Sequence, residues 1–183
     1  MKLPEVTLHP LQPDDREQFI QDNQWAFKYG AQQEFGMRDE RCEEGEEVIS
    51  RQIIEDSVDG ENAEAYRIFL DGKKVGGVVL RIDKDSAKGE LELLFVLPEV
   101  HGKGIGQAAW KAVEAMHPEI KVWETITPYF EKRNIHFYVN RCGFQIVEFW
   151  NKYQHGPAFP DSEEGNWSMD DEMFVFRKEI SDR

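Results

Sequence analysis

The chain has 183 residues, a length typical of one domain, and twelve Phe, five Trp and five Tyr supply bulky core material. Its formal net charge of −14 at pH 7 disfavours duplex nucleic acid and anionic membranes as partners and favours a cationic molecule. Two distant cysteines, Cys42 and Cys142, indicate no disulfide framework, and the absence of a membrane-length apolar run favours a cytoplasmic protein.

Short apolar or alternating runs between turn signals predict strands. The predicted strands are 6–8, 65–70, 74–82, 90–96, 120–125, 144–150 and 173–180. Helical patterns with start and stop signals predict the helices between them. The predicted helices are 13–30, 48–54, 104–116 and 131–141. This mixed order indicates an α/β (α+β layered) fold, with helices on both sides of a central sheet, as a single domain over residues 1–183.

The first predicted helix is rich in aromatic residues. We expect its end at Tyr29 and Gly30, and we expect Trp25 and Phe27 to belong to the core. The acidic stretch 39–47 that follows is expected to be a solvated segment.

A glycine-rich turn joins the strand ending at Val96 to the helix after it. The segment from Val96 to Gly106 reads V-L-P-E-V-H-G-K-G-I-G. Glycines let backbone N–H groups approach an anion, and the following helix N-terminus adds partial positive charge. The sequence therefore predicts a site for a phosphate-bearing ligand.

This turn and a second motif resemble the GNAT superfamily of N-acetyltransferases. The segment 101–106, H-G-K-G-I-G, corresponds to the family's Q/R-x-x-G-x-G/A turn, with His101 in place of the usual Gln or Arg. The segment 137–144, F-Y-V-N-R-C-G-F, corresponds to F-Y-x-x-x-x-G-F. The resemblance covers roughly residues 64–180 and implies about six to seven strands and about four helices, with the sheet splayed between its fourth and fifth strands.

The resemblance implies acetyl-CoA as cofactor. It places the cofactor against the end of the preceding strand, the turn, the start of the helix and two later side chains. These residues are Phe95, Val96, Leu97, His101, Gly102, Lys103, Gly104, Ile105, Gly106, Gln107, Asn134 and Tyr138. Tyr138 is the implied general acid that protonates the leaving thiolate. Asn134 is considered because Glu131 stands where the family often has its pantetheine-binding Asn.

Other phosphate motifs fit less well. A Walker-type loop needs Ser or Thr after its Gly-Lys pair, but Lys103 is followed by Gly104. A dinucleotide fingerprint needs G-x-G-x-x-G, whereas these glycines are spaced by two throughout; Glu124 stands near the position of its acidic ribose reader.

Two carboxylates are candidates for the base that accepts the amine proton. Glu124 and Glu92 both interrupt apolar strand runs, where burial would raise the pKa of a carboxyl. Glu124 is preferred because it stands at the strand end where the splay should open. Glu90 and Glu92 alternate with Leu91 and Leu93, which also fits a solvated side of the strand.

The leading functional hypothesis is direct acetyl transfer from acetyl-CoA to a primary amine of a small molecule or peptide. The net acidity favours a cationic acceptor. A GNAT-fold module that binds acyl-CoA without turnover is the second hypothesis, and a nucleotide-binding oxidoreductase is the third. The histidines lack metal-ligand spacing, so no metal is predicted. The resemblance also implies a homodimer paired through late strands, with Phe149, Trp150 and Phe174 as its exposed residues.

Overall fold

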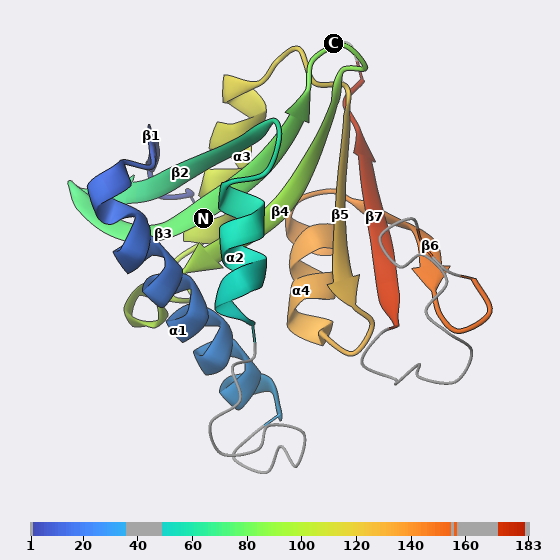
Figure 1. Cartoon of the computed structure of the whole chain (residues 1–183), viewed down its shortest axis with the longest axis horizontal. Helices are drawn as coiled ribbons and strands as arrows, with labels where there is room; N and C mark the ends of the chain where they lie inside the picture. The colour runs from blue at the N-terminus through green and yellow to red at the C-terminus, as the bar shows by residue number, and fades with distance from the viewer. Residues whose placement is uncertain (1, 36–48, 155, 157–171, 182–183) are drawn as a thin grey trace.

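The computed structural model describes residues 2–35, 49–154, 156 and 172–181. Its described strands form one seven-stranded sheet in the order β1-β2-β3-β4-β5-β7-β6 (Figure 1). The strands are β1 Thr7–Pro10, β2 Ala63–Leu70, β3 Lys73–Asp83, β4 Lys88–Val96, β5 Val122–Pro128, β6 Gln145–Trp150 and β7 Met173–Glu179. All neighbours are antiparallel except β4 and β5, which are parallel. The predicted mixed sheet is confirmed.

The helices occur where the sequence predicts them, with different bounds. They are α1 Arg16–Phe35, α2 Arg51–Val58, α3 Ile105–Met116 and α4 Lys132–His136. Short helical turns precede α1 (η1, Pro13–Asp15) and follow β4 (η3, Pro98–Val100), and a π-helical turn continues α4 (η4, Phe137–Arg141). The predicted end of the first helix at Gly30 is wrong. A Cβ at Gly30 would meet no atom within 4 Å, and a glycine inside a helix costs only about 1 kcal/mol, so α1 runs on to Phe35.

Two apolar layers hold the helices against opposite faces of the sheet. On one face, Trp110 of α3 and Tyr138 of η4 pack with Leu91 and Trp123. On the other face, α1 and α2 share a cluster with β3 and β4 that includes Phe19, Ile54, Val79, Leu93 and Phe95.

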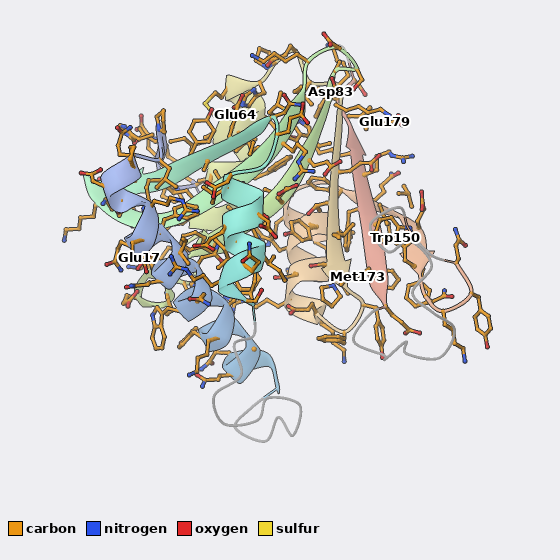
Figure 2. The ribbon with its side chains drawn as sticks, viewed as in Figure 1. Glu17, Glu64, Asp83, Trp150, Met173 and Glu179 are labelled. Carbon is orange, nitrogen blue, oxygen red and sulfur yellow. The ribbon has the colours of Figure 1, made fainter. Side chains whose placement is uncertain are left out.

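Charged side chains join α1 to α2 outside this second layer. Glu17, labelled in Figure 2, accepts hydrogen bonds from both terminal nitrogens of Arg51 at 2.8 and 2.6 Å. Arg16 lies 2.5 Å from Asp59 at the end of α2. Both pairs are largely solvent-exposed, so each contributes little to stability.

The β4–β5 pairing is short, and this shapes the centre of the molecule. The two strands pair only at Lys88–Val122, Gly89–Trp123 and Glu90–Glu124, and they then diverge (Figure 1). Opposite β3, Leu80 pairs with Leu91 and Val79 with Leu93, so Glu92 is an extra residue in a β-bulge. A bulge bends its strand, and this one lies directly after the last β4–β5 pair. The predicted splay is confirmed, and a bulge in β4 lies beside the point where the two strands part.

The burial of two predicted positions differs from expectation. Trp25 is 47% exposed, so its assignment to the core is wrong, whereas Phe27 packs against the core as predicted. Trp25 lies outside the stripe of α1 that faces the sheet, which contains Phe19, Asn23 and Ala26. The acidic stretch 39–47, Cys42 and His155 lie outside the described residues.

Candidate active site

The glycine-rich turn begins at His101 and ends where α3 starts. Gly102 and Gly104 have φ angles of +76° and +74°, in the left-handed region that favours glycine. Gly104 is the N-cap residue of α3, and no side chain caps the first turn of this helix. The backbone N–H groups of residues 102–107 have no acceptor among the described residues. They form a cradle of donors at the positive end of a helix, which suits a phosphate.

The backbone at the end of β4 leads into this turn along the gap. Leu97 N–H donates to the Val75 carbonyl at 2.8 Å, so the backbone N–H and C=O groups of Leu97 and Phe95 point toward β3. Because ladder bonds alternate, the N–H and C=O of Leu94 and Val96 face the side of β5 instead. Of the three strand residues predicted to follow the cofactor, Val96 has its backbone groups in the gap.

His101 bridges the two sides of the gap at its wide end. Its Nε2 lies 2.7 Å from the Val96 carbonyl, and its Nδ1 lies 3.1 Å from Nη2 of Arg133 on α4. Nε2–H donates to the carbonyl and Nδ1 accepts from the guanidinium, so the imidazole is neutral in this arrangement. Burial and the nearby Arg133 lower the pKa of His101. The contact brings a guanidinium to the first residue of the turn.

Tyr138 lies in the wall of the gap, inside an aromatic cluster. Its side chain is 9% exposed, and its ring centroid lies 5.3 Å from that of Phe176 and 5.8 Å from that of Phe144. Burial raises the pKa of this phenol. Tyr138 therefore stays protonated at neutral pH, as a proton donor must.

The two candidate bases have different surroundings. Glu92 sits in the bulge with its side chain 15% exposed, 2.7 Å from Arg81, and burial raises the pKa of its carboxyl. Glu124 belongs to the last β4–β5 pair, is 33% exposed and is held by Arg177 at 3.0 Å through both Nε and Nη2. Both carboxylates are therefore ion-paired with an arginine, and they differ in burial, because Glu92 is the less exposed of the two.

The remaining predicted cofactor residues surround the turn. Lys103 is exposed, and Ile105 is buried against β2 and β3. Gln107 donates to the Arg141 carbonyl at 2.9 Å, and Asn134 donates to Glu131 at 3.0 Å. A Cβ at Gly106 would lie 3.2 Å from the Phe137 ring, so this glycine allows close packing of α3 on η4.

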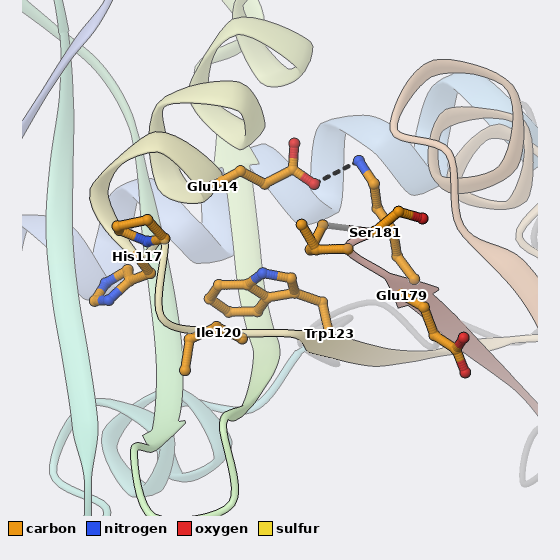
Figure 3. Close-up of a pocket in the computed structure, with 9 residues that line it drawn as sticks. Glu114, His117, Ile120, Trp123, Glu179 and Ser181 are labelled. Atoms are coloured by element: carbon orange, nitrogen blue, oxygen red, sulfur yellow. Dashed lines mark ion pairs between the residues drawn. The ribbon is translucent and has the colours of Figure 1, made fainter. Parts of the chain in front are cut away.

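A cavity of about 400 Å³ lies elsewhere, between the end of α3 and the strands β5 and β7 (Figure 3). Glu114 and Lys178 form an ion pair in its wall, and Trp123 and His117 also line it. At 1.5 Å per residue, the twelve residues of α3 separate the cavity from the turn by about 18 Å. The cavity is therefore separate from the glycine-rich turn.

Three polar side chains were not predicted, of which two lie at or beside the gap and one lies in α1. Thr125 closes the narrow end of the gap, and Arg133 lies beside the turn. Asn23 is fully buried in α1, and its amide has no partner among the described residues. In the sequence alone, Thr125 looks like an ordinary β-branched strand residue and Arg133 looks like an ordinary exposed basic residue. Neither residue therefore carried a signal of its position. Asn23 was detectable as a polar residue within an apolar helical stripe.

Some absences also bear on the chemistry. No group of three or more His, Cys, Asp or Glu side chains among the described residues could hold a metal ion. In the same part of the chain, no helix is long and apolar enough to cross a membrane. Cys142 is buried, and burial raises the pKa of its thiol to about 12, so it is an inert core residue.

Comparisons with known proteins agree with this architecture. A family model described as the acetyltransferase (GNAT) family matches residues 18–144. The chain is 44% identical over 154 residues to the uncharacterized protein YrkN of Bacillus subtilis (strain 168), covering 84% of this chain and 80% of that protein. An acetyltransferase of Thermus thermophilus matches with a TM-score of 0.66 at 14% identity, covering 98% of this chain and 100% of that one. The PaiA N-acetyltransferase of Thermoplasma acidophilum, solved with coenzyme A, matches with a TM-score of 0.64 at 19% identity, covering 96% and 99%.

Proposed function

Because the chain belongs to the GNAT family of acetyltransferases, we propose that it transfers the acetyl group of acetyl-CoA directly to a primary amine of a small molecule or peptide. One observation carries the proposal: a donor cradle, an unpaired strand edge and a buried phenol all border the same gap. The cradle would hold the diphosphate, and the edge of β4 would guide the pantetheine arm toward Tyr138.

The reaction needs a polarised carbonyl, a base and an acid. The gap-facing N–H groups of Leu94 and Val96 would donate to the acetyl oxygen as negative charge develops there. The amine nitrogen then bonds to the carbonyl carbon, and Glu92 accepts the proton that the amine loses. The C–S bond breaks, and Tyr138 donates its proton to the departing sulfur. The products are the N-acetylated amine and coenzyme A, and solvent returns the protons between the two side chains.

The acceptor would approach from the face covered by α1 and α2. Glu92 belongs to this face because it forms an ion pair with Arg81, whose guanidinium lies beside Gly60 just after α2. Alternation along the paired strands places Glu90 and Glu124 on the same face. Carboxylates gathered at the end of the pairing favour a cationic amine, in agreement with the net charge of −14.

Oligomerisation and location are part of the same proposal. The sheet ends at β6, where Ile146, Val147 and Phe149 are 44%, 40% and 38% exposed, and this apolar edge favours a homodimer. Trp150 is only 7% exposed, so it is not one of the exposed residues expected of this edge. Light scattering of the wild type and Ile146→Lys would test the dimer.

We place the enzyme in the cytoplasm, where a free thiol such as Cys142 stays reduced.

Tyr138→Phe tests the catalytic proposal. We expect thiol release from acetyl-CoA with at least one member of an amine panel, loss of that turnover in Tyr138→Phe, and unchanged coenzyme A affinity by calorimetry. Coenzyme A binding without turnover in the wild type would instead favour the non-catalytic module. Absence of coenzyme A binding to folded protein would remove both hypotheses.

A further inference from the structure

The cavity between the end of α3 and the strands β5 and β7 combines apolar and charged walls (Figure 3). Its volume of about 400 Å³ lies in the range of small-molecule pockets. Ile120, Ile180 and the ring of Trp123 give it apolar surface, and Glu114 and Lys178 give it one charge of each sign. A ligand for this cavity therefore has both an apolar part and polar groups.

Trp123 brings a hydrogen-bond donor without an acceptor to this wall. Its side chain is fully buried, and its indole N–H has no acceptor among the described residues. The indole nitrogen lies on the edge of the ring that faces Glu114 (Figure 3). A buried N–H without an acceptor destabilises the fold, so a ligand group that accepts from it restores a missing hydrogen bond.

The ion pair beside Trp123 has further bonding capacity for both signs of charge. Lys178 has three N–H donors, and it gives one to the Cys142 carbonyl at 2.7 Å and one to Glu114. Its third donor and the Trp123 N–H are then available to one carboxylate. Glu114 meets Lys178 with one oxygen, which leaves its other oxygen to accept from an ammonium.

The charges of the wall discriminate between classes of ligand. Glu114 and Glu179 outnumber Lys178, so a simple carboxylic acid is disfavoured. His117 does not change this balance, because both its ring nitrogens lie within 3.1 Å of carboxylates outside the cavity wall. A simple amine leaves the Trp123 N–H without an acceptor. A zwitterion supplies the acceptor and the ammonium together.

We infer that this cavity binds a free α-amino acid with an aliphatic side chain. Its carboxylate accepts from Trp123 and Lys178, its ammonium donates to Glu114, and its side chain lies against Ile120 and Ile180. The cavity is separate from the glycine-rich turn, so this inference does not depend on the proposed function.

Proton–nitrogen correlation spectra of the whole chain without acetyl-CoA test the site, with the indole signal of Trp123 assigned by Trp123→Phe. L-Leucine should shift this signal saturably and leave the signal of Trp25 on α1 unchanged. Isoamylamine, which lacks the carboxylate, and isocaproate, which lacks the ammonium, should each bind at least about tenfold more weakly, because each loses a hydrogen bond to a charged group. An unmoved Trp123 signal, as for a cavity that holds only water, would overturn the inference, and so would equal binding of the three probes. A shift confined to Trp25 would place leucine at α1 and refute the site.

Lys178→Met keeps the aliphatic stem and removes the ammonium group. It should weaken leucine binding about tenfold and leave isoamylamine binding unchanged. Lys111→Met is the matched control, since Lys111 is an exposed residue of α3 that does not line the cavity, and it should bind leucine as the wild type does. Equal weakening in both variants would refute the assignment. Melting curves show whether each variant folds, and if Lys178→Met does not, the three probes on the wild type decide the question.

Discussion

Gly102 offers a direct test of the donor cradle. Its φ of +76° lies in the left-handed region, and a Cβ there would meet no atom within 4 Å. Gly102→Ala therefore introduces no clash, and its cost is the backbone preference alone, about 1–2 kcal/mol for an L-residue in this region. The turn can relax without unfolding the sheet, so the cost should lower the fraction of molecules that hold the binding conformation. The apparent Kd for coenzyme A should rise about 5- to 30-fold.

Gly72 is a matched control for this substitution. It has a φ of +74° in the β2–β3 hairpin, again with no atom within 4 Å of an added Cβ. Gly72→Ala adds the same backbone strain far from the turn, so it should lower stability and leave coenzyme A affinity unchanged. Calorimetric titration of both variants measures the effect. A Kd for Gly102→Ala within twofold of the wild type would refute the assignment of the turn as the diphosphate site.

Three further predictions follow from the site. Because burial raises the pKa of the Glu92 carboxyl above its ordinary value of 4.5, kcat/KM should rise with pH through that raised pKa as the base loses its proton. Glu92→Gln should remove this rise from the pH profile, and Glu124→Gln should keep it. The opposite pattern would transfer the role of the base to Glu124. Arg133→Ala should weaken coenzyme A binding about tenfold, whereas Lys132→Ala, an equal charge change on the same helix, should not; equal effects would point to general electrostatics. Asn23→Leu should raise the free energy of unfolding by about 1–2 kcal/mol in urea titrations, since it removes a buried amide with no partner among the described residues, and a destabilised variant would contradict this account.

The predicted features that the structure confirms are those encoded locally. Gly104 was recognisable because a glycine before a helix marks a turn, and its φ of +74° agrees with that interpretation. The splay between β4 and β5 followed from the family resemblance rather than from any strand pattern, and the parallel pairing of these two strands was not predicted. Tyr138 was identified by its motif, but the pattern predicted an ordinary helix where the chain forms a π-helical turn.

The features that could not be predicted depend on pairing between distant segments. The run Glu90 to Leu93 alternates as a regular strand, and only its register against β3 reveals the extra residue at Glu92. This bulge gives Glu92 its half-buried surroundings, which sequence could not distinguish from those of Glu124. The hydrogen bond of the Thr125 hydroxyl likewise depends on Leu91, 34 positions earlier in the chain. Tertiary contacts of this kind leave no local periodicity to read.

The surplus residue at Glu92 also constrains how such a protein can change over time. The bulge consists of one inserted residue, so the strand either contains it or lacks it. The opening beside it therefore cannot be widened or narrowed in small steps. Gaining or losing a residue there would exchange the two faces of everything that follows on the strand, from Leu93 to Val96. New acceptor preferences must therefore arise in the helices and connections that surround the opening, while the opening itself is inherited intact.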